Sequence, residues 1–122
     1  MVVHRGEVWW ADLGEPRGSG LGFRRPLLIV QADAFNRSRI RTVLCVVLTS
    51  NLALLDAPGN VLIDAGRAGL PKDSVANVSQ VVTLDRDYLI ERVGRVDPDL
   101  LAEVDDGLRL VLDVWEESSY QG

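Results

Sequence analysis

The chain has 122 residues, 47% of them hydrophobic and 25% charged, which is typical of one globular domain with a single core. The only cysteine excludes an internal disulfide, and one cysteine with one histidine supplies too few ligands for a zinc site. No stretch approaches the roughly 20 apolar residues of a membrane span. We therefore expect one soluble, cytoplasmic domain over 1–122 that uses no metal and no cofactor.

The charge is distributed unevenly along the chain. A formal net charge of -5 argues against a generic nucleic-acid coat protein, which would bind phosphates through an excess of Lys and Arg. Residues 1–41, however, contain seven arginines against four acidic residues, whereas 97–122 contain eight acidic residues against one arginine. One end of the molecule could thus contact an anion while the other stays solvated.

The chain alternates segments of strand-like and turn-like composition. The predicted strands are 5–13, 25–33, 42–50, 60–66, 74–84 and 89–96. A glycine-rich loop at 14–23, a polar connection at 34–41 and a turn-rich segment at 67–73 separate them. Continuous apolar runs predict that the second and third strands are central and buried on both faces, with Cys45 a buried, unreactive thiol.

The end of the chain changes from strand to helix periodicity. Asp97 is a plausible N-cap, followed by Pro98 at the first helical position. Apolar residues then recur every three or four positions, at Leu101, Val104, Leu108, Val111, Leu112 and Trp115. This stripe must be covered by the chain's own sheet or by a second copy. Six strands with one amphipathic helix favour a mainly β fold, a small and partly open barrel.

Two groups of polar residues stand at predicted strand ends. Arg24 and Arg25 follow the glycine-rich loop, where their guanidinium groups could bind phosphate oxygens. Thr49, Ser50 and Asn51 stand where the third strand leaves the core. Taken alone, the first group is better explained as solvated surface arginines that pair with nearby acids, and the second as an ordinary polar turn.

A third polar group lies within the fifth predicted strand. Strand alternation places Asn77 and Ser79 on one face, and Ser74 and Gln80 on the other unless a bulge intervenes. None of these groups contains a pair of histidines, a carboxylate dyad or a metal-ligand set. RNA suits such a site, because its own 2′-hydroxyl can attack the adjacent phosphorus while the enzyme positions the backbone and stabilises charge.

Several motifs together give the chain a recognisable pattern. The segments RGEVWWADL, RPLLIVQ behind a glycine-rich loop, the strand end LTS, and DSVANVSQVVTLD occur in an order that resembles the MazF/PemK family of toxin endoribonucleases. The resemblance spans nearly the whole chain. It implies a CcdB/PemK-like, SH3-type barrel, a homodimer, and metal-independent cleavage of single-stranded RNA at short sequence motifs.

The resemblance also implies roles for individual residues. Arg25 takes the position of the family's catalytic arginine and Thr49 that of its strand-end threonine, with a 2′,3′-cyclic phosphate and a 5′-hydroxyl as products. Since arginine normally stays protonated, with a pKa above about 12, charge stabilisation suits Arg25 better than proton abstraction. The implied RNA groove contains Arg17, Ser19, Arg24, Ser74, Asn77 and Gln80. A cognate MazE-like antitoxin with a flexible, acidic tail would occupy that groove.

This chain departs from some members of the family. Ser79 stands where some PemK-like members have a catalytic aspartate, and Ser19 where they have a histidine. Gly20 replaces a loop glutamate, so the resemblance assigns no residue to accept the 2′-hydroxyl proton.

Two alternative functions share the predicted fold. One is a toxin that poisons DNA gyrase by binding it, but such relatives commonly end in Trp-Gly-Ile, whereas this chain ends in WEESSYQG. The other is a noncatalytic SH3-like binding module, in which Arg25 and Thr49 would be replaceable.

Overall fold

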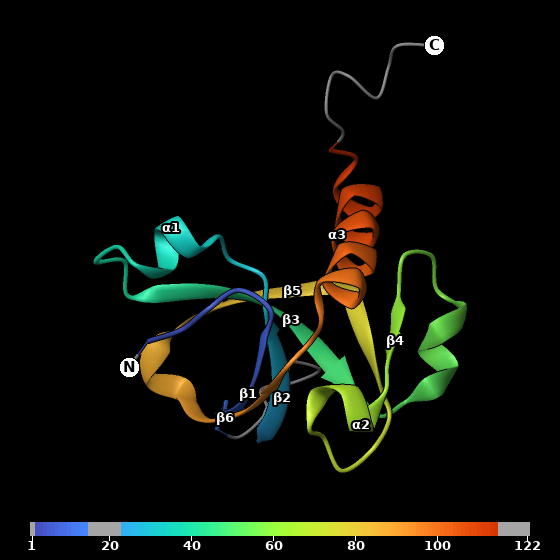
Figure 1. Ribbon diagram of the computed structural model, residues 1–122, viewed down its shortest axis with the longest axis horizontal. Helices are drawn as coiled ribbons and strands as arrows, with labels where there is room; N and C mark the ends of the chain where they lie inside the picture. Colours follow the sequence, from blue (N-terminus) through green and yellow to red (C-terminus); the bar gives the residue numbers. More distant parts are fainter. Residues whose placement is uncertain (1, 15–22, 115–122) are drawn as a thin grey trace.

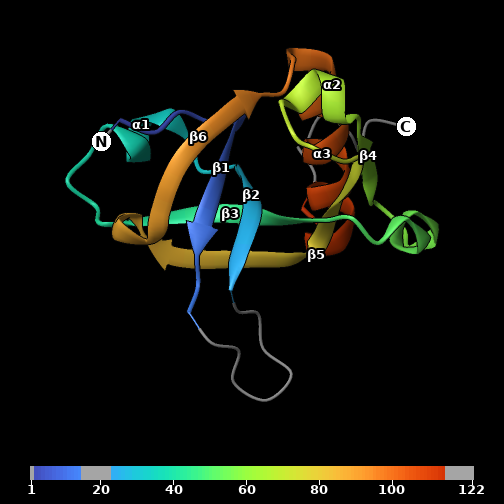
Figure 2. The ribbon, with the colours of Figure 1, turned by 90° about the horizontal axis from the view of Figure 1, so that it is seen from below.

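A computed structural model describes residues 2–14 and 23–114. Its strands are β1 (Glu7–Asp12), β2 (Arg24–Ile29), β3 (Thr42–Thr49), β4 (Val61–Ile63), β5 (Ser74–Asp85) and β6 (Leu89–Arg95). Its helices are α1 (Asp33–Asn36), α2 (Ala65–Ala68) and α3 (Pro98–Leu112), with 3-10 turns η1 (Leu52–Asp56) and η2 (Arg86–Tyr88). The strands form one antiparallel sheet in the order β4-β5-β3-β2-β1-β6, curled into a half-barrel (Figures 1 and 2). The predicted mainly β, partly open barrel with a C-terminal helix is confirmed.

The curled sheet carries apolar residues on both faces. Leu28 and Val46 belong to a cluster that packs against α3, whereas their neighbours Leu27 and Val47 belong to a second cluster on the opposite face. All four side chains are almost completely buried. The continuous apolar runs thus arise because successive side chains of β2 and β3 enter different halves of the core. The predicted central position of these two strands is confirmed.

The second strand ends earlier than predicted. We expected strand to residue 33 and a polar connection afterwards, but β2 ends at Ile29 and the short helix α1 begins at Asp33. Asp33 Oδ1 accepts hydrogen bonds from the Arg5 backbone N–H (2.8 Å) and the Asn36 amide (3.1 Å). These two bonds, the first of them the stronger influence, lower the pKa of Asp33. The turn is therefore fixed by a contact with Arg5, which lies far away in the sequence.

A bulge interrupts β5 and decides the open question about its polar residues. Val46 of β3 pairs with Val81, but the next residue, Val47, pairs with Asn77, so that 78–80 bulge out of the ladder. The bulge lets the Asn77 side-chain amide donate to Gln80 Oε1 at 2.9 Å. Asn77 and Gln80 therefore meet, although simple alternation would place them on opposite faces.

Helix α3 begins as predicted. The Asp97 carboxylate accepts a hydrogen bond from the Leu100 backbone N–H at 2.8 Å, and Pro98 occupies the first turn. Asp97 also pairs with the Arg67 guanidinium at 2.6 Å. The Arg67 side chain, followed by the Leu100 N–H, lowers the pKa of Asp97. The predicted N-cap is confirmed, and it also links α3 to α2. That helix was not expected: strand was predicted over 60–66, but β4 ends at Ile63 and α2 begins at Ala65.

The apolar stripe of α3 is covered only in its first half. Val104 is buried against the sheet, as is Leu100, which the predicted stripe did not include, whereas Val111 and Leu112 are 44% and 61% exposed. Trp115, the last predicted member of the stripe, lies outside the described residues. Within those residues no helix is long and apolar enough to cross a membrane.

Candidate functional site

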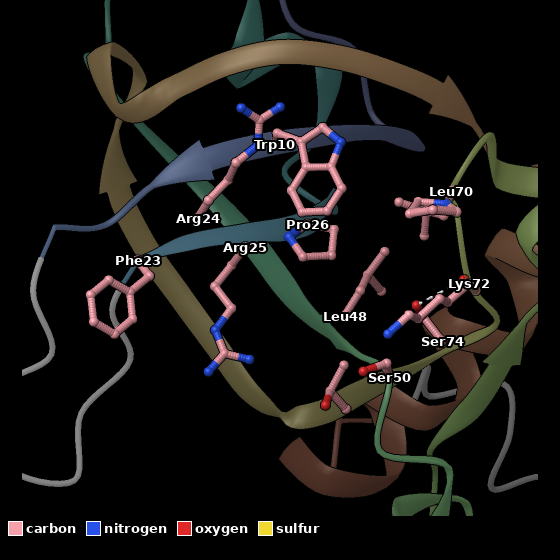
Figure 3. Close-up of a pocket in the computed structure, with 12 residues that line it drawn as sticks. Trp10, Phe23, Arg24, Arg25, Pro26, Leu48, Ser50, Leu70, Lys72 and Ser74 are labelled. Carbon is pink, nitrogen blue, oxygen red and sulfur yellow. Dashed lines mark hydrogen bonds between the residues drawn. The ribbon is translucent and has the colours of Figure 1, made fainter.

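A cavity of about 390 Å³ opens at the junction of β1, β2 and β3 with the segment that leads into β5 (Figure 3). Its lining combines cationic, hydroxyl and aromatic side chains over an apolar floor. The lining residues are Trp10, Phe23, Arg24, Arg25, Pro26, Leu48, Thr49, Ser50, Leu70, Pro71, Lys72 and Ser74.

The antiparallel register of β2 and β3 brings the two predicted catalytic residues together. Leu27 pairs with Val47, so the start of β2 lies beside the end of β3. Extending this register by two residues sets Arg25 level with Thr49. Both side chains are half-buried and line the cavity. Arg25 and Thr49 lie far apart in the sequence and form one site only because β2 and β3 pair.

The cavity is electropositive. Its described lining contains three cations, Arg24, Arg25 and Lys72, and no carboxylate. The Arg24 guanidinium stacks 5.0 Å from the Trp10 ring centroid and lies 3.7 Å from a carboxylate oxygen of Glu91, so its charge is partly balanced. Among the described residues Arg25 has no ion-pair partner. Arg25 and Lys72 are therefore available to bind an anion.

The hydroxyl of Thr49 is oriented by the turn that follows β3. Thr49 Oγ1 accepts a hydrogen bond from the Asn51 backbone N–H at 3.2 Å, and Asn51 in turn caps η1 by accepting from the Ala53 N–H at 3.2 Å. Because the Thr49 oxygen accepts this bond, its own hydrogen remains available to donate. The site can therefore offer an anion both guanidinium N–H groups and a positioned neutral donor.

The predicted RNA-groove residues divide into three groups. Arg24 and Ser74 line the cavity, and Ser74 Oγ donates to the Lys72 carbonyl at 3.3 Å. Asn77 and Gln80 do not line it, and both are engaged in the β5 bulge. The remaining two predicted groove residues, Arg17 and Ser19, lie outside the described residues.

Sequence reasoning missed seven lining residues, of which Trp10, Phe23 and Lys72 carry an aromatic ring or a charge. Trp10 is one of two adjacent tryptophans whose side chains alternate across β1, and nothing local indicates which of them faces the cavity. Lys72 stands in a turn-rich segment where a lysine is ordinary. Phe23 was assigned to the glycine-rich loop, and its aromatic side chain among glycines was the one available signal.

Neither the thiol nor a metal-ligand cluster offers chemistry within the described residues. Burial raises the pKa of Cys45 to about 12, which agrees with the predicted unreactive thiol. In the ranges 2–14 and 23–114, no three His, Cys, Asp or Glu side chains converge in a way that could hold a metal ion.

Similar proteins support one family. A family model described as PemK-like, MazF-like toxin of type II toxin-antitoxin system matches residues 4–112. Endoribonuclease MazF6 of Mycobacterium tuberculosis strain H37Rv is 52% identical over 114 residues, covering 93% of this chain and all of the relative. Endoribonuclease EndoA of Bacillus subtilis is 35% identical over 112 residues, covering 92% of this chain and 96% of the relative.

Solved structures agree with this assignment. An endoribonuclease in complex with its cognate antitoxin, from a mycobacterial species, has a TM-score of 0.71 and 28% identity, covering 94% of this chain and 98% of its own. These relatives match nearly the whole chain, including the strands whose ends form the cationic cavity. The chain therefore belongs to the PemK-like, MazF-like toxin family of type II toxin–antitoxin systems.

Proposed function

We propose that this chain is a sequence-specific endoribonuclease toxin, acting as one domain in the cytoplasm, which cleaves single-stranded RNA without a metal ion and so inhibits translation and growth. The observation that carries the proposal is that Arg25, near the start of β2, and Thr49, at the end of β3, line the same electropositive cavity. The endoribonuclease names of relatives that match almost the whole chain support the same reaction.

In the proposed reaction the RNA supplies its own nucleophile. The 2′-oxygen attacks the adjacent phosphorus and loses its proton, while the bond from phosphorus to the 5′-oxygen breaks and that oxygen gains a proton. The products are a 2′,3′-cyclic phosphate and a 5′-hydroxyl. Arg25 donates hydrogen bonds to the nonbridging phosphate oxygens, where negative charge increases in the transition state. Thr49 donates its hydroxyl hydrogen to the same phosphate group.

The rest of the RNA groove extends from this centre. Arg24 and Ser74 lie beside the catalytic pair, where they would contact the sugar-phosphate backbone. Asn77 and Gln80 would reach bases only by exchanging the hydrogen bond that they now share. Residues 17 and 19 belong to the proposed groove by family resemblance.

Purified protein is expected to cut a long single-stranded RNA in the presence of EDTA, at recurrent short motifs, leaving 5′-hydroxyl ends. Thr49→Ala should lower kcat/KM by about 10- to 100-fold, because it removes one neutral donor from the transition state. Thr49→Ser keeps the hydroxyl and should stay within about threefold of the wild type. Mapping of cut sites and end chemistry measures these effects. Intact RNA after incubation with folded wild-type protein would refute the proposed function.

The second part of the proposal concerns partners. A MazE-like antitoxin would place an acidic segment in the cavity, opposite Arg25 and Lys72, and thereby exclude RNA. One of the structural neighbours is an endoribonuclease in complex with its cognate antitoxin. The exposed apolar end of α3, which includes Val111 and Leu112, supports the homodimer expected from the family.

The product of the neighbouring small open reading frame is expected to bind the purified protein and to stop RNA cleavage. Because acidic groups would meet cationic ones, the affinity should fall as the salt concentration rises. Titration calorimetry at two salt concentrations, with a parallel cleavage assay, measures both effects. Tight binding that leaves cleavage at full rate would contradict an antitoxin seated in the cavity.

A further inference from the structure

Phe23 is an exposed aromatic residue at the rim of the proposed RNA site. Its side chain is 62% exposed, and it lines the cavity together with Arg25, two residues further along the chain. In Figure 3 its ring lies at the end of the cavity opposite Leu70 and Lys72, beyond the Arg25 side chain. The ring is therefore close to the proposed phosphate site but makes no part of the buried core.

The backbone at Phe23 is strained. Its φ of 58° lies in the left-handed region, where a residue with a bulky side chain is an outlier and glycine is favoured. Two backbone hydrogen bonds hold this conformation: the Phe23 N–H donates to the Gly14 carbonyl, and the Phe23 carbonyl accepts from the Leu13 N–H at 2.9 Å. A glycine at position 23 would adopt this φ without steric strain. The aromatic ring thus needs an explanation outside the folded chain.

The surroundings of the ring indicate its ligand. Proteins that bind single-stranded nucleic acid combine cationic side chains for the backbone with exposed aromatic faces on which bases stack. Arg25 provides the cationic side chain and Phe23 the aromatic face, and their Cα atoms are separated by about 7 Å at most, the length of two extended residues. Trp10, the other aromatic lining residue, is half-buried beneath Arg24 and presents less free surface.

We propose that Phe23 is a specificity-determining residue that stacks on a base next to the phosphate held by Arg25. The inference rests on the proposed function and deepens it. Stacking favours a nucleotide that carries a base over one that lacks it, and favours large bases over small ones. Phe23 would thereby contribute to the choice of cleavage site without reading hydrogen-bond patterns.

The test compares a strain-relieving variant with a ring-preserving one on a defined RNA that contains one mapped cut site. Phe23→Gly removes the ring and suits the observed backbone, so it should fold at least as stably as the wild type. It is expected to lower kcat/KM by about 10-fold, the size of one lost base stack. Phe23→Tyr should keep the wild-type rate. Phe35→Ala is the matched control, because Phe35 is 58% exposed in α1, away from the cavity.

A modified RNA then identifies the stacked base. With an abasic nucleotide on the correct side of the cut, wild type and Phe23→Gly should cleave at equal rates. If wild type cuts RNA and Phe23→Gly cuts intact RNA equally well, the inference fails while the proposed function stands. The inference also fails if Phe23→Gly cleaves RNA at the wild-type rate but is no longer inhibited by the antitoxin, because Phe23 would then contact the antitoxin and not a base. If wild type cuts no RNA, the proposed function fails and this inference falls with it.

Discussion

Arg25→Ala is expected to lower kcat/KM for RNA cleavage by about 100- to 1,000-fold, the largest effect of any single substitution in the cavity. The Arg25 guanidinium is half-buried and has no ion-pair partner within the described residues, so its charge and its N–H donors are free for the phosphate. Its loss removes hydrogen bonds that strengthen as charge accumulates on the phosphate oxygens. Single-turnover cleavage of a defined RNA measures the change directly.

Two further variants separate geometry from charge. Arg25→Lys keeps the positive charge but loses the planar fork that binds two phosphate oxygens at once, so its activity should lie between those of wild type and Arg25→Ala. Arg39→Ala removes one positive charge from an exposed position in the connection before β3 and should stay within about threefold of wild type. Equal losses in Arg39→Ala and Arg25→Ala would show that only overall charge matters and would contradict a catalytic Arg25.

Gly107→Ala is expected to lower the free energy of unfolding by about 2 kcal/mol, although alanine is the better helix former. A Cβ at Gly107 would lie 2.1 Å from the Gly59 carbonyl oxygen and 3.1 Å from a Val78 methyl. The clash with a backbone atom forces α3 away from the turn that contains Gly59, and this overpacking outweighs the roughly 1 kcal/mol gained in helix propensity. Urea denaturation, with the slope checked for constancy, measures the change.

Gly66→Ala is the matched control for this prediction. Gly66 also lies in a helix, α2, but a Cβ there would meet nothing within 4 Å. The substitution should therefore raise the free energy of unfolding by about 0.5 to 1 kcal/mol. A Gly107→Ala protein as stable as Gly66→Ala would mean that α3 can shift away from Gly59 without loss of packing.

Much of the fold could be predicted from local pattern. Six strands, the two central ones and the capped C-terminal helix follow from apolar runs, β-branched residues and the Asp97-Pro98 pair, each of which acts over a few neighbouring residues. The three- and four-residue spacing of apolar residues after Asp97 correctly predicted a C-terminal helix. Its coverage was not predictable, because Val104 packs on the chain's own sheet whereas Val111 is exposed.

The candidate site could be predicted only in part. Arg25 and Thr49 were identified through resemblance, and their strand-end positions were readable from the chain. The bulge that joins Asn77 to Gln80 depends on how β5 pairs with β3, so no local signal reveals it. The same is true of Lys72, which reaches the cavity only because the segment before β5 folds over the sheet.

The sequence by itself determined the identity and order of the strands and the start of the last helix, because hydrophobic periodicity and capping are properties of residues close together in the chain. The tertiary structure alone decided which tryptophan faces the cavity, that Arg25 and Thr49 line the same cavity, and that Phe23 remains exposed on a strained backbone. These features depend on strand register and curl, which arise from contacts between residues that are distant in sequence.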